Sequence, residues 1–470
     1  MLQAIARPPY TSFAGSAFKS NGIYGIAPGL INAPFARALG LALGEMAIER
    51  GISAVVVGRD CRINGVELIA ALQAGLRATG INVIDIGMTT TPLAYFAAHE
   101  CGSGAAVIVT GGHLPSGYNG FNIMLDGREL HGTALQSLRE RMDEGAAAQA
   151  VEPGARSQVS LQADYIKRIA TDIRLARPMH IAVDCGNGMA GPVLPALLRE
   201  LGCTVTELFC EPNGEFPNHL PDPGDRQNLQ DLIYCLRYSE CELGIALDGD
   251  GDRLAVVTKA GAIIGSDQLM MVFGHDLLAR QPGVRIVHDV QSSRHLQRTI
   301  ASAGGHTTMW RTCRASIRAR MDEEGALLGG DTSGHLMFQD RWYGFSDGAY
   351  AAARLLELLS QDPRDAMSRL DSLPFVCTTP ELRALTGAAD PQRLVDTLCH
   401  TAQFAGSDDF IQIDGLRVEY ADGFGLVRAS TSTSALVFRF EADNLHALTR
   451  IQAEFRKQLR RVAPRLQLPF

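Results

Sequence analysis

The feature that most constrains the fold is a unit that recurs three times: an apolar strand, a short turn, a helix and a second strand. Its copies begin with AVVVGRD (54–60), HIAVDCGNG (180–188) and RIVHDV (285–290). Each first strand is nearly continuous in β-branched and apolar residues, which is typical of a strand buried on both faces of a sheet. Strands that alternate with helices predict right-handed crossovers and largely parallel sheets. Ligands of such sheets sit beyond the carboxyl ends of the strands.

The chain reads differently after about residue 375. FIQIDGLRVEY alternates in polarity and turns at Asp-Gly, which is a hairpin signal. SALVFRFEA predicts another strand, and LHALTRIQAEFRKQLRRV predicts a helix after it. This pattern favours a separate α+β domain. Together with three plausible linkers, it predicts four domains at 1–157, 158–262, 263–374 and 375–470.

Composition narrows the class of protein. The net charge of -8 over 470 residues gives no electrostatic footprint for nucleic acid. No apolar run reaches the roughly 20 residues of a membrane span, and the N-terminus lacks the apolar core of a secretory signal. Ten scattered cysteines without a C-x-x-C pair indicate reduced thiols in a cytoplasmic protein. We expect a monomer that binds neither nucleic acid nor membranes.

The strongest chemical signal is ALDGDGDRLAVV (246–257). A strand runs into Asp248, Asp250 and Asp252, and the intervening glycines let the backbone curl so that three carboxylates converge. Without a cation these carboxylates would repel one another, and hard oxygen ligands suit Mg²⁺ or Ca²⁺. An EF-hand loop requires Gly at position six and Glu at position twelve, where this chain has Arg253 and Lys259. We therefore expect Mg²⁺ with a coordination position left open for phosphate.

Four motifs, in order along the chain, resemble those of the α-D-phosphohexomutases, in particular the bacterial phosphomannomutase/phosphoglucomutase branch. They are T-G-x-H-x-P-x-x-Y-N-G-F, DGDGDR, G-x-x-S-G-H, and R-x-S followed by Ser or Thr. The resemblance implies four domains around a central cleft: three related α/β domains with mixed, mainly parallel sheets, and a C-terminal α+β domain. It also implies an isomerase that interconverts the 1- and 6-phosphates of mannose or glucose through a phosphoserine and a hexose 1,6-bisphosphate, with Mg²⁺ as cofactor.

The resemblance assigns roles position by position. It makes Asp248, Asp250 and Asp252 the metal ligands, and His113 and His335 catalytic candidates. In the third domain it points to the sugar-recognition loop GGDTSGH (329–335), where aspartate stands in place of the family's glutamate. The predicted substrate-binding residues are Arg253, Thr312, Asp331, Ser333, Arg428, Ser430, Thr431 and Ser432. The last four form a phosphate cradle of one cation, hydroxyls and backbone N–H groups.

The pattern breaks where the family performs its chemistry. Gly112 stands at the position of the nucleophilic serine, and glycine has no oxygen to phosphorylate. Tyr24, Asn122 and Gln291 stand where the family has an arginine and two lysines. Three interpretations remain open. The first is a working mutase for polysaccharide precursors, and the second is a phosphosugar-binding pseudoenzyme that acts as a regulator or partner of an active paralogue. The third is an altered enzyme, such as a weak phosphatase or a mutase that takes phosphate from free bisphosphate or another carrier. Residue chemistry favours the second, so that ordinary turnover is expected to be lost or severely impaired.

Overall fold

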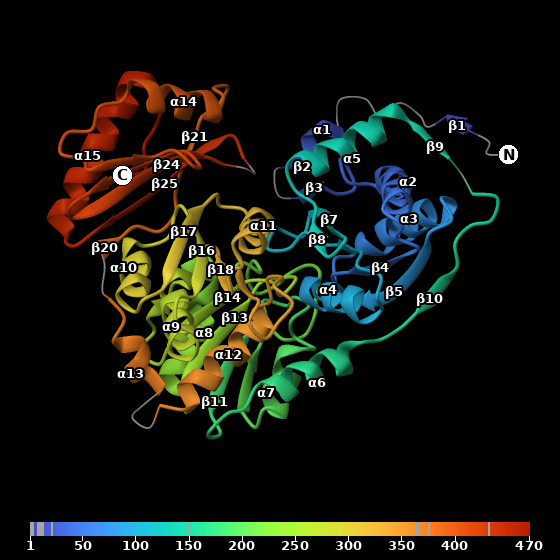
Figure 1. Ribbon diagram of the computed structural model, residues 1–470, viewed down its shortest axis with the longest axis horizontal. Helices are drawn as coiled ribbons and strands as arrows, with labels where there is room; N and C mark the ends of the chain where they lie inside the picture. Colours follow the sequence, from blue (N-terminus) through green and yellow to red (C-terminus); the bar gives the residue numbers. More distant parts are fainter. Residues whose placement is uncertain are drawn as a thin grey trace. The chain divides into compact units, whose positions relative to one another are not determined.

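The computed structural model describes residues 4–6, 14–19, 22–148, 150–362, 366–374, 377–430 and 433–470 (Figure 1). The chain forms two compact units. Unit 1 comprises Met1–Leu269 and Ser333–Asp371, and unit 2 comprises Met270–Thr332 and Ser372–Phe470. The stretch 333–371, which the sequence predicts to belong to the third domain, thus groups with the first two domains.

The first domain is built on one mixed sheet with the strand order β10-β5-β4-β6-β7-β3-β2. Strands β10, β5, β4 and β6 are parallel neighbours, and β7, β3 and β2 continue the sheet in antiparallel pairs. The strands are β2 (Phe18–Lys19), β3 (Gly22–Ile26), β4 (Ala54–Arg59), β5 (Asn82–Met88), β6 (Ala106–Val109), β7 (Tyr118–Leu125), β8 (Arg128–Glu129) and β10 (Arg156–Gln158); β1 (Ala4–Ala6) pairs separately with β9 (Ala146–Ala148).

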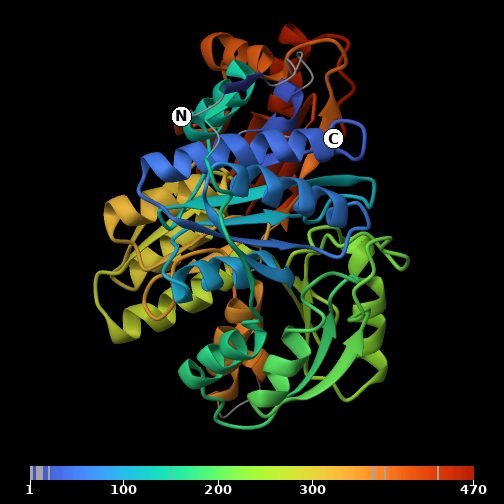
Figure 2. The same ribbon diagram turned by 90° about the vertical axis from the view of Figure 1, so that its right-hand side faces the viewer.

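Helices cover both faces of this sheet. They are α1 (Ala14–Ala17), α2 (Ala33–Glu49), α3 (Gly65–Ala78), α4 (Thr91–Glu100) and α5 (Thr133–Glu144). Val55 and Val57 of β4 face the core that α2, α3 and α5 share, whereas Val56 between them faces the opposite side. Figure 2 shows α2 and α3 in blue on one face of the sheet and α4 on the other.

Helices α2 and α3 approach each other through glycine. A Cβ atom at Gly40 would lie 2.3 Å from the carbonyl oxygen of Leu72, and one at Gly75 would lie 2.2 Å from that of Arg37. Only glycine allows two helix backbones to come this close. The close packing fixes α3 and hence the segment 60–64 that connects it to β4.

The second domain has the strand order β12-β11-β13-β14-β15. Strands β12, β11 and β13 are parallel, and β13, β14 and β15 pair antiparallel. The strands are β11 (His180–Asp184), β12 (Thr204–Leu208), β13 (Leu243–Leu247), β14 (Leu254–Thr258) and β15 (Ile263–Ile264), and the helices are α6 (Gln162–Asp172), α7 (Leu194–Glu200), η1 (Arg226–Leu229) and α8 (Gln230–Tyr238).

Unit 1 is completed by β19 (Leu336–Phe338), α12 (Gly348–Ser360) and α13 (Ala366–Asp371). Helix α12 packs against α7, β13 and β14 of the second domain. The N-terminus of α12 also contacts the loop between β13 and β14. The N–H of Gly348 donates to the main-chain carbonyl of Gly251 over 3.1 Å, and the hydroxyl of Ser346 donates to the main-chain carbonyl of Asp252 over 2.7 Å. A segment far along the sequence therefore supports the acidic loop.

Unit 2 contains two sheets. In the first, β17 (His306–Trp310), β16 (Arg285–Asp289) and β18 (Leu328–Gly330) are parallel neighbours, with α10 (Arg294–Ser302), α11 (Arg314–Glu324) and most of α9 (Ser266–Arg280) around them. The second sheet has the order β20-β25-β24-β23-β22, with β21 also on β25. Its antiparallel strands are β20 (Cys377–Thr378), β21 (Leu382–Leu385), β22 (Asp409–Ile411), β23 (Leu416–Tyr420), β24 (Gly423–Ala429) and β25 (Ala435–Ala442), and α14 (Pro391–Thr401) and α15 (Leu445–Val462) pack on them.

A buried arginine joins these two sheets within unit 2. The side chain of Arg417 on β23 is fully buried, and its Nη1 donates to the carbonyls of Val290 and Ser292 over 2.6 and 2.7 Å. Its Nε donates to Glu419 over 2.7 Å, and its guanidinium lies 3.6 Å from the ring centre of Phe424. The segment after β16 is thereby held on the C-terminal sheet. Among the described residues, no helix combines the length and apolarity needed to cross a membrane.

Candidate active site

The acidic loop connects the antiparallel strands β13 and β14, which are fully buried. Asp248, Asp250 and Asp252 are each at most 2% exposed, and one ligand oxygen from each lies within 4.8 Å of the others. Gly251 turns the backbone with a φ of +78°, a conformation that side chains rarely adopt. The predicted convergence of the three carboxylates is therefore present.

The carboxylate trio fits a divalent cation. Oδ1 of Asp248 accepts hydrogen bonds from the N–H groups of Asp252 and Arg253, over 3.0 and 3.1 Å. Oδ2 of Asp248 is buried and accepts no hydrogen bond. Burial, together with the charges of Asp252 and Asp250, raises the pKa of Asp248 well above its ordinary value. An orphaned buried oxygen in a mutually repelling trio is the environment that a hard cation would relieve.

Asp250 is held by the first domain. The hydroxyl of Thr91 donates to its Oδ2 over 2.6 Å, and the N–H of Thr91 donates to its main-chain oxygen over 2.9 Å. Nδ2 of Asn122 lies 3.3 Å from the same Oδ2. Thr91 occupies this place because Thr90 caps the N-terminus of α4, which begins there. Thr91 and Asn122, two side chains that hold Asp250, are uncharged.

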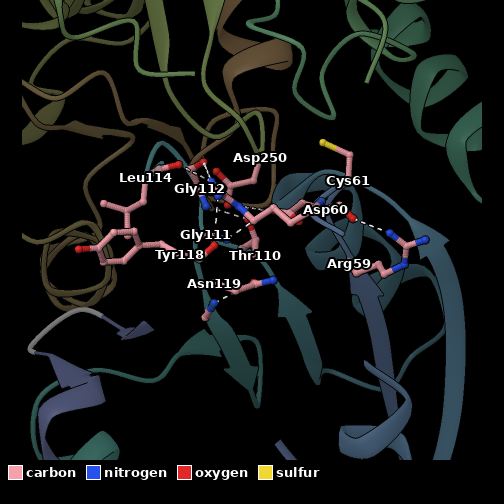
Figure 3. A network of polar contacts seen from close by, with 12 residues as sticks. Arg59, Asp60, Cys61, Thr110, Gly111, Gly112, Leu114, Tyr118, Asn119 and Asp250 are labelled. Carbon is pink, nitrogen blue, oxygen red and sulfur yellow. Dashed lines mark hydrogen bonds and ion pairs between the residues drawn. The ribbon is translucent and has the colours of Figure 1, made fainter. Parts of the chain in front are cut away.

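Gly112 faces Asp250 from the loop between β6 and β7, and Figure 3 shows the two residues side by side. A Cβ atom at Gly112 would lie 3.4 Å from Oδ1 of Asp250. Gly112 has a φ of +53°, in the left-handed region. Its carbonyl oxygen also lies against Gly249 of the acidic loop, where a Cβ atom would come within 2.5 Å of it. A side chain at position 112 would thus point at the trio.

Two predicted residues from the sugar-recognition loop lie beside the trio. Nε2 of His335 is 3.4 Å from Oδ1 of Asp252 and 3.4 Å from Nε of Arg253, and His335 is 5% exposed. Oγ of Ser333 lies 2.9 Å from Nδ1 of His335 and so orients the imidazole. Arg253 also forms an ion pair of 3.8 Å with Asp248.

The remaining predicted residues of unit 1 come from the first domain. Burial and the charge of Arg253 lower the pKa of His113 well below its ordinary value, which favours the neutral imidazole. Tyr24 on β3 is paired with Gly120 on β7, two residues before Asn122. In strands of this register Tyr24 and Asn122 lie on the same face of the sheet. Two of the three positions that the resemblance associates with lost cations are therefore neighbours.

Unit 2 gathers a second set of predicted residues. The N–H of Thr312 donates to Oδ2 of Asp414 over 3.1 Å, and Nη1 of Arg428 lies 3.4 Å from the same oxygen. Nε of Arg428 is buried and has no hydrogen-bond acceptor among the residues that the structure describes. Ser430 accepts a hydrogen bond of 3.0 Å from the hydroxyl of Thr433. The other two predicted cradle residues, Thr431 and Ser432, lie outside the described residues.

Asp331 lies in unit 2 near a second buried carboxylate, Asp289. Burial and the charge of Asp331 raise the pKa of Asp289 to about 6. The hydroxyls of Ser292, Thr312 and Thr332 donate to Asp289 over 2.7, 3.3 and 3.0 Å. Gln291 is 3% exposed. The two acids thus share one polar region of unit 2.

Sequence reasoning missed several residues that build these groups. They are Asp60, Arg62, Thr91, Asp289 and Asp414. Two signals were available. Asp289 lies at the carboxyl end of a predicted parallel strand, where ligands gather, and Thr-Thr-Pro at 90–92 is a helix start signal. Asp414 was interpreted only as part of a hairpin turn.

The folds and the carboxylate trio together define a multidomain α/β protein with a buried cluster of three carboxylates. Comparison with known families makes this specific. Four models described as phosphoglucomutase/phosphomannomutase match the chain: alpha/beta/alpha domain I at residues 15–149, alpha/beta/alpha domain II at 163–261, alpha/beta/alpha domain III at 265–374, and the C-terminal domain at 377–458. The chain belongs to this family, the α-D-phosphohexomutases.

Individual relatives cover nearly the whole chain. It is 44% identical over 455 residues to the phosphomannomutase/phosphoglucomutase of Pseudomonas aeruginosa, covering 97% of this chain and 98% of the relative. It is 44% identical over 447 residues to the phosphoglucomutase of Neisseria gonorrhoeae, covering 95% and 97%. The crystal structure of a phosphoglucomutase/phosphomannomutase family protein from Burkholderia thailandensis matches with a TM-score of 0.91 and 44% identity, over 97% of this chain and 99% of that one. The predicted four-domain α/β fold is confirmed.

Proposed function

We propose that this chain is a Mg²⁺-dependent hexose phosphate-binding member of its family in which the ordinary phosphoserine relay is lost or severely impaired. One observation carries the proposal: the residue that faces Asp250 from the first domain is a glycine, which has no side-chain oxygen, and Asn122, an uncharged residue at a position where the family has a lysine, lies 3.3 Å from Asp250. A phosphoryl carrier needs an oxygen at this place, and transferring phosphate needs cations to stabilise its charge.

Each group of residues has a role in this proposal. Asp248, Asp250 and Asp252 hold Mg²⁺, which when bound neutralises phosphate charge. Arg428, with its unpaired buried Nε, holds the phosphate of a mannose or glucose 1- or 6-phosphate, and Ser430, Thr431 and Ser432 supply further donors. Ser333 and Asp331 contact sugar hydroxyls, and Thr312 and Arg253 line the binding surface. His335, steadied by Ser333, and neutral His113 remain able to move a proton.

The second candidate is an active phosphomannomutase/phosphoglucomutase that uses free hexose 1,6-bisphosphate or another phosphate carrier. The 44% identity to relatives with these names favours it, as does the position of His335 beside the trio. In this reading the transferred phosphate comes from a donor that the protein does not carry covalently. In both candidate functions the protein is a cytoplasmic monomer that acts in hexose phosphate metabolism. The two candidates differ in the expected rate of turnover.

A coupled mutase assay separates the two candidates. We expect turnover of glucose 1-phosphate and mannose 1-phosphate to be at least about 10⁴-fold below that of the Pseudomonas aeruginosa relative, with or without glucose 1,6-bisphosphate. Losing one preorganised stabiliser typically costs about 10²–10³ in rate, and here the nucleophile is missing as well. Intact mass spectrometry should show no added phosphoryl group. Brisk turnover with bisphosphate would favour the second candidate.

Binding is tested separately by thermal shift. Millimolar hexose phosphate with Mg²⁺ should raise the melting temperature, and Arg428→Met should reduce this rise. Absence of any shift in the unsubstituted protein would contradict both candidates.

Restoring a hydroxyl should not restore the enzyme. Gly112→Ser places a side chain at a φ of +53°, which costs about 1–2 kcal/mol in the left-handed region. We expect a lower melting temperature and less than about a tenfold gain in mutase rate, because the cations remain absent. Gly117→Ser is the matched control, since the same loop offers open space there. Recovery of a relative's rate by Gly112→Ser alone would show that the other positions matter little.

A further inference from the structure

Arg62 is the most completely bonded side chain near the candidate site. Its side chain is fully buried, although it lies in the short segment between β4 and α3. A guanidinium has five N–H donors in a fixed planar arrangement. Nε donates to Oδ2 of Asp60 over 3.0 Å. The four remaining donors reach four main-chain carbonyls of a single loop, which connects β6 and β7 and contains Gly112.

The four carbonyls belong to residues spread along that loop. Nη2 donates to Gly112 over 2.9 Å and to Leu114 over 2.6 Å. Nη1 donates to Pro115 over 2.6 Å and to Tyr118 over 3.1 Å. All five donors are thus matched to protein acceptors. Arg62 has no donor left for a phosphate, so it does not act as a substrate-binding cation, despite its position beside the loop.

Asp60 completes the arrangement from the other side. Besides Arg62, its Oδ2 accepts from the hydroxyl of Thr110 over 2.9 Å and from the N–H of Gly111 over 3.1 Å. Figure 3 shows Asp60, Thr110, Gly111 and Gly112 gathered in one network beside Asp250. In the ion pair of Asp60 with Arg62, Asp60 therefore holds the beginning of the loop that connects β6 and β7, and Arg62 holds its middle and end. A buried pair of this kind is favourable only when every remaining donor and acceptor is satisfied, as it is here.

The second domain also contacts the ion pair of Asp60 with Arg62. The guanidinium of Arg62 lies 4.8 Å from the ring centre of Phe216, in a cation–π contact. Phe216 has a φ of +52°, which is unusual for a bulky residue and indicates that its surroundings hold it in place. Gly214 packs so closely on the main chain of Cys61 that a Cβ atom would lie 2.4 Å from its carbonyl oxygen. Arg62 and the neighbouring main chain thus contact a second-domain segment as well as the first-domain loop.

We propose that Arg62 is the positioning residue of the cation and phosphate site: it fixes the loop of residues 110–118, and through it the place of Gly112 against the acidic loop. The carbonyl oxygen of Gly112 accepts a hydrogen bond from the guanidinium of Arg62 and also packs against Gly249. The direction of this carbonyl therefore sets the distance between the loop of residues 110–118 and the acidic loop. This inference rests on the proposed function for what the site binds. The loop geometry itself does not depend on that function.

The test uses Arg62→Lys in the full-length protein. A lysine has three donors and no planar fork, so it cannot serve four carbonyls and Asp60. We expect faster amide hydrogen exchange across residues 110–118 in the metal-free protein. We also expect Mg²⁺ affinity, measured by calorimetry, to fall about 10–100-fold, as is typical when a partner that orients metal ligands is lost. Arg59→Lys is the matched control, because the side chain of Arg59 makes one hydrogen bond, to the carbonyl of Asp60; it should change Mg²⁺ affinity less than about twofold.

A second variant guards against a general loss of structure. Arg62→Ala leaves a buried space of guanidinium size, and millimolar guanidinium ion should restore part of the Mg²⁺ affinity and of the exchange protection. A merely destabilised fold would not regain function on addition of a denaturant cation. If neither variant folds, exchange in the unsubstituted protein decides: the amide of Gly111, bonded to buried Asp60, should be among the slower amides of the loop regions, and exchange as fast as in an exposed turn would overturn the proposal.

The outcomes separate this inference from the proposed function. Variants that fold, keep protection across residues 110–118 and bind Mg²⁺ like the unsubstituted protein would overturn the role of Arg62. If the unsubstituted protein bound neither Mg²⁺ nor hexose phosphates, the proposed function would fail. The exchange measurements on Arg62→Lys and Arg59→Lys would still decide whether Arg62 fixes the loop.

Discussion

Asp248→Asn is expected to weaken Mg²⁺ binding by at least about 100-fold, because removing a ligand should exceed the 10–100-fold that loss of an outer partner typically costs. The same substitution should raise the melting temperature of the metal-free protein. Three buried carboxylates repel one another, and Oδ2 of Asp248 accepts no hydrogen bond. The ion pair with Arg253, at 3.8 Å, offsets only part of this cost, because the pKa of Asp248 remains raised. An asparagine keeps an oxygen that can accept the two N–H donors of Asp252 and Arg253.

The opposite signs of the two effects make this prediction specific. Calorimetry measures the Mg²⁺ affinity, and melting with and without a chelator measures stability. Asp231→Asn is a suitable control, because Asp231 is an exposed residue of the same domain; it should alter neither quantity appreciably. If Asp248→Asn bound Mg²⁺ with unchanged affinity, the three aspartates would not be the Mg²⁺ ligands.

Arg417→Met is expected to destabilise unit 2 by about 3–5 kcal/mol, the usual cost of removing one partner from a buried ion pair. Methionine fills a similar volume but donates no hydrogen bond. The carbonyls of Val290 and Ser292 and the carboxylate of Glu419 would each lose a close donor, and Phe424 would lose its cation–π partner. Native-state hydrogen exchange of β23–β25 measures the loss.

The control for this prediction is on the same sheet. Arg383 on β21 forms an ion pair with Glu381, but both side chains are largely exposed. Arg383→Met should therefore cost less than about 1 kcal/mol. If Arg417→Met and Arg383→Met destabilised the protein equally, the buried contacts of Arg417 would not stabilise the packing of the two sheets of unit 2.

Local patterns predicted most of the secondary structure. The first strand of each recurring unit was placed correctly, at β4, β11 and β16, and each pairs in parallel with the second strand of its unit. The Asp-Gly hairpin is β22–β23, and the final helix spans Leu445–Val462 as its pattern indicates. These features were predictable because hydrophobic periodicity and turn residues act over a few residues.

The contacts that shape the site were not predictable in this way. Thr91 and Asp250 are 159 residues apart, and Arg62 lies about 50 residues before the loop it holds. A charged residue directly after a strand usually indicates a solvent-exposed turn, and only the tertiary structure shows that Arg62 is buried with every donor used. The sequence predicted that the three aspartates would cluster because glycine and aspartate alternate there. The neutral partners of Asp250 carry no such signal.

The acidic loop is held by residues that the ribosome adds to the chain much later. The carbonyl of Asp252 accepts its hydrogen bond from Ser346, 94 positions further along, and α12 then covers β13 and β14. During synthesis the three aspartates emerge well before the helix that closes their sheet, while all of 270–332 is still to be translated. A nascent chain stopped before residue 346 would carry the three aspartates without Ser346 and α12, so the acidic loop gains its full support only after about three quarters of the chain has been made.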